Sequence, residues 1–102
     1  MRDLTRIFLK MAIAIATFKI MPVDPEQDLD RITAEAEKLI TGFAGDTEHR
    51  VKREPIAFGL VAVMITFVVD EAKGGLDPLQ EEIAKVEGVN SCDLSDWRRA
   101  IG

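Results

Sequence analysis

The longest apolar stretch of the chain lies just past its midpoint. Ten residues, Leu60 to Val69, are apolar apart from Thr66, and many of them are β-branched or aromatic. Helix is the competing interpretation for a run of this length, but Pro55 and Gly59 before it and Gly74-Gly75 after it favour a central strand. Such a strand has two faces. Five large residues share one face, and a smaller, mixed set shares the other: Val61, Val63, Ile65, Phe67 and Val69 against Leu60, Ala62, Met64, Thr66 and Val68.

A helix is predicted ahead of this strand, between Asp24 and Gly42. Asp24 suits the N-cap, Pro25 the first helical position and Gln27 the reciprocal capping position, and Gly42 is expected to end the helix. Its buried stripe has a spacing of 3.6 residues and consists of Leu29, Ile32, Ala36, Leu39 and Ile40.

A second helix is predicted between Asp77 and Gly88. Asp77-Pro78 repeats the cap-plus-proline start, with Gln80 at the capping position, and Gly88 is expected to end the helix. Its buried stripe consists of Leu79, Ile83 and Val86.

Three further strands are expected. The first covers Ala12 to Met21 and stops at Pro22, because proline cannot donate to a sheet ladder. The second, Thr47 to Ile56, carries so many charges that it should lie at an edge. The last covers Ser91 to Trp97, with Cys92 and Leu94 pointing inward and with Asp93 and Ser95 pointing outward.

The order strand, helix, strand, strand, helix, strand predicts an α+β fold, a ferredoxin-like βαββαβ sandwich. It is a four-stranded antiparallel sheet with both helices on one face, and right-handed crossovers place the first and third strands in the middle. The other sheet face is left open and would carry apolar side chains, a feature that usually marks a contact surface. These are Ile13, Ile15, Leu60, Met64 and Val68. The domain is assigned to residues 11–102, with residues 1–10 as an N-terminal extension.

Composition narrows the classes of function. The net charge is −5, which argues against direct nucleic-acid binding, since that binding relies on Lys and Arg displacing counterions. The only cysteine, Cys92, reads as a small buried hydrophobe and fits a cytoplasmic protein. Residues 11–18 resemble a short secretory signal, but Lys19 closes the apolar stretch early and the segment reads equally well as a strand. No apolar run is long enough for a membrane span.

No enzyme signature, cofactor motif or metal site is found in the sequence. Gly74-Gly75 lacks a following Lys-Ser or Lys-Thr, and the single histidine, His49, has no partner at metal-ligand spacing. The residues indicate a protein-binding module without naming its partner.

A set of motifs from residue 54 onward resembles the archaeal elongation factor 1-beta family. They are Glu54-Pro-Ile-Ala-Phe-Gly-Leu60, Asp70-Glu71 with Gly74-Gly75, Asp77, Glu81-Glu82, Glu87-Gly88-Val89 and Asp96-Trp97-Arg98-Arg99, and the strand end Ile20-Met21-Pro22 also fits. The resemblance covers about Met11 to the C-terminus. It implies the same fold, and a translation factor that promotes guanine-nucleotide exchange on the GTPase elongation factor 1-alpha.

The resemblance also implies partner-binding residues. Phe58, followed by Gly59, matches a phenylalanine that contacts the GTPase in eukaryotic relatives; the alternative is a packed residue of the hairpin core. Arg99, or alternatively Arg98, matches a lysine near the relatives' C-terminus that reaches toward the magnesium site; the alternative is a solvated tail charge. With Ile15 and Met64 of the open face, these residues form the expected partner-binding set.

Two other functions remain open. A self-associating or small-ligand regulatory domain would use the same open face, and would show as a stable dimer that buries Ile13, Ile15 and Met64. An acylphosphatase-like enzyme would need an anion-binding loop after the first strand, where Pro22-Val23-Asp24-Pro25 stands instead. The exchange factor is expected to be a monomer or to self-associate weakly.

Overall fold

The fold is described from a computed structural model, which covers residues 13–45 and 48–99. The predicted extension, residues 1–10, lies outside the described residues. In chain order the elements are β1 (Ile13–Pro22), α2 (Leu29–Ala44), β2 (His49–Pro55), β3 (Val61–Asp70), the single 3₁₀ turn η1 (Glu71–Lys73), α3 (Asp77–Ala84) and β4 (Val89–Arg99).

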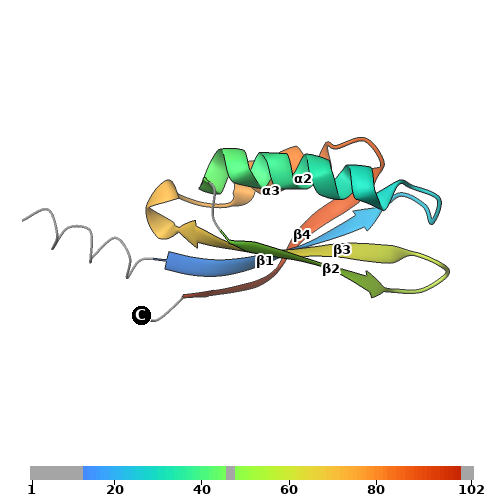
Figure 1. The fold of residues 1–102 in the computed structure, drawn as a ribbon, viewed down its shortest axis with the longest axis horizontal. Coiled ribbons are helices and arrows are strands. Elements are labelled where there is room, and N and C mark those ends of the chain that lie inside the picture. Colours follow the sequence, from blue (N-terminus) through green and yellow to red (C-terminus); the bar gives the residue numbers. More distant parts are fainter. Residues whose placement is uncertain (1–12, 46–47, 100–102) are drawn as a thin grey trace, which may run out of the picture.

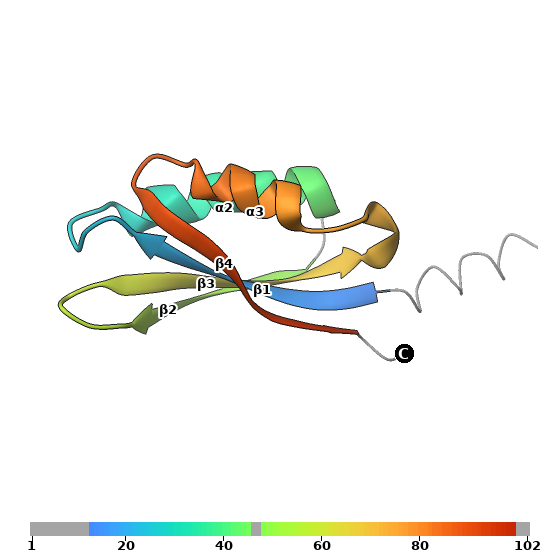
Figure 2. The ribbon, with the colours of Figure 1, turned by 180° about the vertical axis from the view of Figure 1, so that it is seen from behind.

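The four strands form one antiparallel sheet in the order β2-β3-β1-β4. Both helices cover the same face of the sheet, and the two opposite views in Figures 1 and 2 show the other face without a helix. The predicted ferredoxin-like arrangement is confirmed, with β1 and β3 in the centre and the charged strand β2 at an edge.

The core lies between the two central strands and the helices. Along β1, alternate residues from Ala14 to Ile20 are fully buried, and the residues between them are only half-buried. The rings of Phe18 and Phe67 meet at the middle of this layer, with centroids 5.3 Å apart. The helices close over them with buried side chains at Ile32, Ala36 and Ile40 in α2 and at Leu79 and Ile83 in α3.

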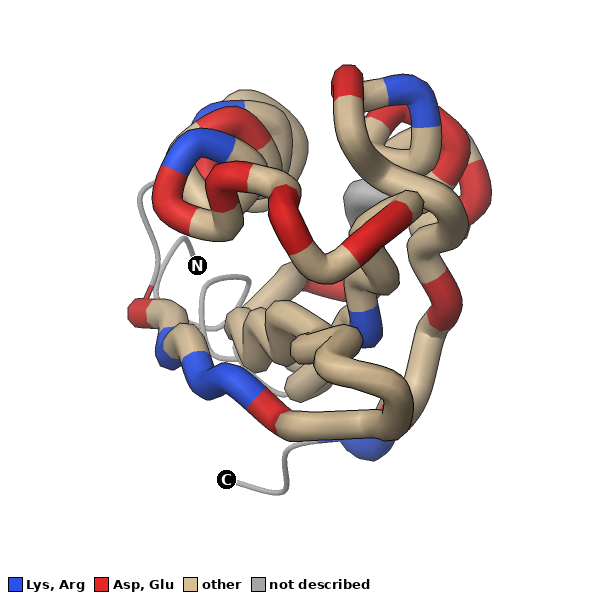
Figure 3. The backbone as a smooth tube through the Cα atoms, turned by 90° about the vertical axis from the view of Figure 1, so that its right-hand side faces the viewer, with Lys and Arg blue, Asp and Glu red and all other residues tan. Residues whose placement is uncertain are grey.

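Ion pairs attach the edge strand β2 to the helix layer. Arg53 pairs with Asp30 of α2, and His49 Nε2 lies 2.7 Å from Glu37 Oε2 of the same helix. Figure 3 shows acidic residues gathered in the helix layer and its loops, whereas a run of basic residues follows the sheet edge below. Basic side chains on one face of β2 therefore meet acidic side chains of α2.

The predicted start of the first helix is wrong by several residues. The α2 helix begins at Leu29, and its N-cap is Asp28, whose Oδ1 accepts from the Arg31 amide at 3.2 Å. Asp24 instead closes a turn, because its carboxylate accepts from the Glu26 amide and from the side-chain amide of Gln27. Asp and Asn side chains stabilise such turns as readily as they cap helices, so two aspartates four residues apart compete.

The far end of α2 is also displaced. The helix continues through Gly42 to Ala44 and stops where Gly45 takes φ +87°, with the Gly45 amide donating to the Thr41 carbonyl at 2.9 Å. A glycine inside a helix costs only about 1 kcal/mol, which the buried stripe of α2 tolerates.

The predicted cap of the second helix is wrong as well. Asp77 is already helical, the cap position is Leu76, and no side chain caps it. Gln80 does not serve a capping box, because its side-chain amide donates to the Cys92 carbonyl at 2.8 Å and so joins α3 to β4. The helix ends at Ala84, and Gly88 lies in the turn that follows, with φ +91°.

The last strand is longer than predicted and carries a bulge. Thr17 pairs with Asp96 and Phe18 with Leu94, which leaves Ser95 without a partner in the register. Leu94 does share the helix side of the sheet with Phe18, but it is 40% exposed, so its predicted burial is wrong. Bulges bend a strand and raise its twist, and β4 beyond Cys92 is exposed along its whole length.

We expect Phe67→Ala to lower the free energy of unfolding by about 3–5 kcal/mol, since it leaves a cavity against Phe18. Urea denaturation measures this loss. Phe58→Ala is the matched control, because Phe58 is 97% exposed and its truncation should change stability by no more than about 0.5 kcal/mol. Equal losses in the two variants would contradict the core described here.

Candidate functional site

The tip of the β2–β3 hairpin has an unusual backbone. The Leu60 amide donates to the Ala57 carbonyl at 2.9 Å, which closes a turn whose two central residues, Phe58 and Gly59, have φ +55° and +81°. Positive φ at both central positions belongs to the type I′ turn, which Asn-Gly or Gly-Gly normally occupies. Phe58 is the only non-glycine residue with positive φ in the part of the chain described.

Phe58 is also almost fully exposed, at 97%. The alternative that it packs into the hairpin core is therefore wrong. A bulky side chain in the left-handed region costs about 1–2 kcal/mol, and an exposed ring returns nothing to the fold to offset this. A residue that combines backbone strain with an exposed aromatic ring is a strong candidate for contact with another molecule.

Gly59 places this tip against the loop between β1 and α2. A Cβ built on Gly59 would lie 3.6 Å from two atoms of the Pro25 ring, an ordinary van der Waals contact. The positive φ rather than lack of space therefore makes a larger residue unfavourable here.

Ile15 and Met64 lie on the open face of the sheet, as predicted. At its centre the Thr17 and Thr66 hydroxyls are 2.8 Å apart, and Ile15 and Met64 lie on either side of this pair along the strands. A shallow hollow of about 590 Å³ covers this region, lined by all four of these side chains. On its β2 side lie Arg50 and Lys52, Glu48 and Glu54, so the face is a short apolar strip with charged borders.

The two terminal arginines lie on opposite faces of the sheet. Arg98 pairs in register with Ile15, which places it on the open face, whereas Arg99 pairs with the buried Ala14 and lies on the helix side. Arg98 Nη2 is 3.2 Å from Asp96 Oδ2, and the two side chains are 71% and 48% exposed. Only Arg98 is therefore contiguous with the apolar strip.

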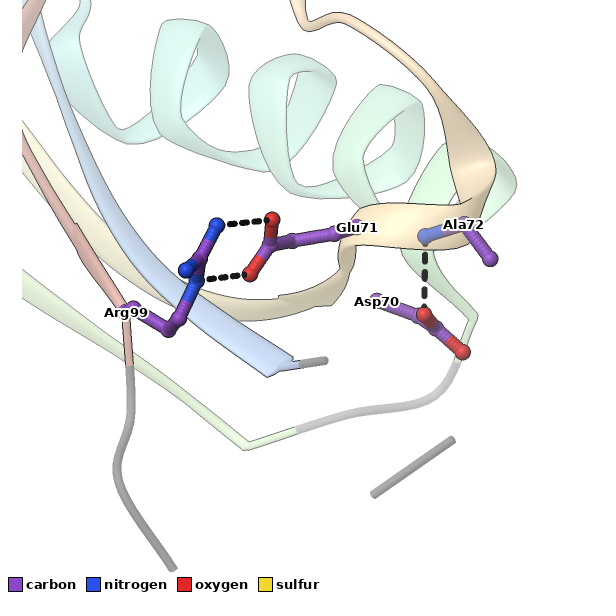
Figure 4. Close-up of polar contacts among 4 residues, drawn as sticks. All are labelled: Asp70, Glu71, Ala72 and Arg99. Atoms are coloured by element: carbon purple, nitrogen blue, oxygen red, sulfur yellow. Dashed lines mark hydrogen bonds and ion pairs between the residues drawn. The ribbon is translucent and has the colours of Figure 1, made fainter. Parts of the chain in front are cut away.

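Arg99 reaches over the end of β1 to Glu71 in η1, and Figure 4 shows the two groups meeting side by side. Nε donates to Glu71 Oε2 at 2.8 Å and Nη2 donates to Oε1 at 3.1 Å. These hydrogen bonds and the charge of Glu71 raise the pKa of Arg99 above its ordinary value. The pair therefore joins the strand ends of β3 and β4, on either side of β1.

The hairpin tip and the arginines lie at opposite ends of the sheet (Figure 1). Arg99 is level with Val69, because both pair with Ala14, and the hairpin begins before Val61. Eight residue steps of a strand plus the turn span roughly 30 Å. A single group on another molecule could therefore not meet both ends at once.

Sequence reasoning missed an apolar hollow beside Arg99. It measures about 310 Å³ and includes Leu94 and Trp97 of β4 with Glu71, Leu76 and other residues that follow β3. Trp97 is 43% exposed, and it shares the helix side of the sheet with Arg99 because it pairs with Ala16. Only the bulge in β4 sets this orientation, and the sequence pattern carries no signal for its position.

Cys92 is 4% exposed, as a small buried hydrophobe should be. Burial, with a smaller contribution from the charge of Asp93, raises the pKa of its thiol to about 12. A thiol that remains protonated at neutral pH is a poor nucleophile. No group of three or more His, Cys, Asp or Glu suited to a metal ion occurs within the described ranges.

None of the helices in the described part of the chain is long and apolar enough to cross a membrane.

Comparisons with known proteins decide the family. Residues 15–99 match the EF-1 guanine nucleotide exchange domain. The chain is 38% identical over 91 residues to the elongation factor 1-beta of Methanothermobacter thermautotrophicus, with 89% of this chain and 100% of the relative covered. The chain belongs to the elongation factor 1-beta family. The elongation factor 1-beta of Methanosarcina acetivorans is also 38% identical, over 87% of this chain and 99% of that relative.

Membership in the elongation factor 1-beta family makes the chain a translation elongation factor with a nucleotide-exchange role, and implies elongation factor 1-alpha as its partner. Solved structures add the fold alone. A de novo designed protein, Foldit4, has a TM-score of 0.59 at 16% identity, with 88% of this chain and 98% of that chain covered. The ACT domain from the GTP pyrophosphokinase of Chlorobium tepidum has a TM-score of 0.53 at 24% identity, covering 84% and 91%.

We expect Phe58→Gly to stabilise the domain by about 0.5–1 kcal/mol, because glycine takes positive φ without the Cβ penalty. The midpoint of urea denaturation measures the gain. Phe58→Ala keeps the penalty and should stay near the wild type. A loss of stability in Phe58→Gly would mean that the ring packs against the fold.

We expect the raised pKa of Cys92 to make the wild type lose stability at high pH. The unfolded thiol ionises near pH 9 and the folded one near pH 12, so the stabilisation is complete below about pH 9 and is lost progressively toward pH 12. Urea denaturation at about pH 8 and about pH 11 should show a larger loss in the wild type than in Cys92→Ala. Equal losses would show that the thiol does not contribute.

Proposed function

We propose that this chain promotes GDP-to-GTP exchange on elongation factor 1-alpha by weakening the partner's nucleotide–magnesium site. In this proposal Phe58, Gly59 and the open sheet face dock on the GTPase. The cation at the end of β4, Arg99 or Arg98, acts on the magnesium-bridged phosphates. The observation that carries the proposal is the strained and exposed Phe58 within a chain of this family.

An exchange factor of this kind needs no bond chemistry of its own. It binds the nucleotide-free GTPase more tightly than the loaded form, and by linkage the nucleotide then binds the complex more weakly by the same factor. A tenfold weakening requires about 1.4 kcal/mol of differential contact, and a thousandfold weakening about 4 kcal/mol.

The hairpin tip can supply much of the docking energy. Fully burying an exposed aromatic side chain is worth about 1.5–3 kcal/mol. The turn already fixes the backbone at Phe58 and holds the ring away from the domain, so binding need order only the side-chain rotamer. This supports Phe58 as an anchor for the partner rather than as a contributor to folding.

The C-terminal end offers the cations. The Arg98 and Arg99 side chains are 71% and 65% exposed despite their internal pairs, so each guanidinium remains accessible to a partner. Arg98 would act from the open face and Arg99 from the helix side. The separation of roughly 30 Å argues for two contact regions, with the hairpin anchoring the complex and the arginine end alone acting at the nucleotide.

We expect the purified chain to accelerate release of a fluorescent GDP analogue from elongation factor 1-alpha. Phe58→Ala should weaken the apparent affinity for the GTPase about tenfold to a hundredfold, because it removes the ring that would be buried against the partner. The double variant Arg98→Ala/Arg99→Ala should instead lower the maximal release rate at saturation, by about tenfold or more. Stopped-flow fluorescence over a range of factor concentrations separates the two effects.

Lys38→Ala is the control for charge, because Lys38 lies exposed on α2 and forms no ion pair within the described residues. Its release kinetics should match those of the wild type. Absence of acceleration by the wild type would refute the function. A double arginine variant with unchanged kinetics would refute the mechanism alone, and a stable dimer that buries Ile15 and Met64 would favour the self-associating alternative.

A further inference from the structure

Glu71 is the fixed member of its pair with Arg99. It opens η1, which Asp70 caps by accepting from the Ala72 amide at 2.9 Å, and its own carbonyl accepts from the Gly74 amide at 3.1 Å. The Glu71 side chain is only 25% exposed. Its carboxylate therefore stands on a short turn that is hydrogen-bonded at both ends.

Arg99 is the exposed member, with 65% of its side chain accessible. A guanidinium group carries five N–H donors in one plane. The contact with Glu71 uses Nε–H and one N–H of Nη2, which leaves both N–H groups of Nη1 and one of Nη2 without a partner in the described structure. The carboxylate occupies one edge of the guanidinium plane, so the remaining donors are on the edges turned away from Glu71.

We propose that Glu71 is a positioning residue for nucleotide exchange, which holds the Arg99 guanidinium side-on so that its free edge donates to an oxyanion of the partner complex. This inference rests on the proposed function. The oxyanion is a carboxylate of elongation factor 1-alpha or a phosphate of its nucleotide, and both match the planar guanidinium fork. Without Glu71, the long side chain at the end of β4 samples many rotamers.

The sign of the effect separates positioning from simple charge. If Arg99 acted only through its charge, the negative charge of Glu71 would oppose it, and Glu71→Gln would speed exchange. If Glu71 orients Arg99, the same change slows exchange, because misplacing a catalytic group costs rate even when its charge is retained.

The experiment measures fluorescent GDP release from elongation factor 1-alpha with the wild type, Glu71→Gln, Arg99→Ala and the double variant Glu71→Gln/Arg99→Ala, and with two further single variants. Glu71→Gln is expected to lower the maximal rate by about threefold to tenfold, and the double variant is expected to match Arg99→Ala. Glu71→Asp keeps the charge but shortens the arm, so it should behave like Glu71→Gln. Glu81→Gln, which removes the same charge from an exposed site on α3, should match the wild type.

Each outcome bears on a separate statement. A wild type that does not accelerate release would refute the proposed function and the inference with it. An Arg99→Ala variant with normal kinetics would overturn the inference and leave Arg98 as the acting cation. Normal Arg99 dependence with an unchanged or faster Glu71→Gln rate would overturn the inference alone. So would a Glu71→Gln loss that persists in full in the Arg99→Ala background. Thermal unfolding of each variant shows whether a loss reflects a damaged fold.

A binding measurement identifies the source of the oxyanion. If it is a carboxylate of elongation factor 1-alpha, Glu71→Gln weakens binding to the nucleotide-free GTPase as well as slowing release. If it is a nucleotide phosphate, affinity for the nucleotide-free GTPase is unchanged and only release from the GDP-bound form is slowed.

Discussion

The antiparallel pairing of β1 with β3 is the constraint on which the rest of the structure depends. It aligns two strands whose alternate residues are fully buried, from Ala14 paired with Val69 to Ile20 paired with Val63. A shift of one residue would exchange the two faces. The helices must cover the buried set, and the half-buried set becomes the open face. The residues of the open face therefore follow from the register of the core.

The same pairing fixes how far apart the two ends of the candidate site lie. The hairpin precedes β3 and η1 follows it, so Phe58 and Glu71 lie at opposite ends of this central strand. Strained or exposed side chains are tolerated at these ends because the core between them is closely packed around Phe18 and Phe67. The contacts that stabilise the fold lie in the middle of the sheet, and the strained Phe58 lies at one of its ends.

The spacing of apolar residues predicted the features of the fold that depend on burial. It could not predict the features that depend on local hydrogen bonds. The order of elements and the open face with Ile15 and Met64 follow from the spacing of apolar residues, and the central position of β1 and β3 follows from the right-handed crossovers. The helix starts did not follow, because Asp24 and Asp28 are both good caps and only the folded turn selects between them. The bulge at Ser95 leaves no mark on composition, yet it determines which face Trp97 and Arg99 occupy.

The candidate site was predictable in identity but not in geometry. The motif that contains Phe58 indicates the residue. Only the structure shows that its ring is exposed and that its backbone has a positive φ, which is unfavourable for a bulky side chain. Adjacent arginines at a chain end are equivalent in sequence, whereas alternation along β4 sends Arg98 to the open face and Arg99 to Glu71. An ion pair whose arginine is 65% exposed adds little to stability. In the proposed mechanism the pair instead fixes the direction of the guanidinium, and direction matters more than stability for a group that would act on a partner about 30 Å from the hairpin.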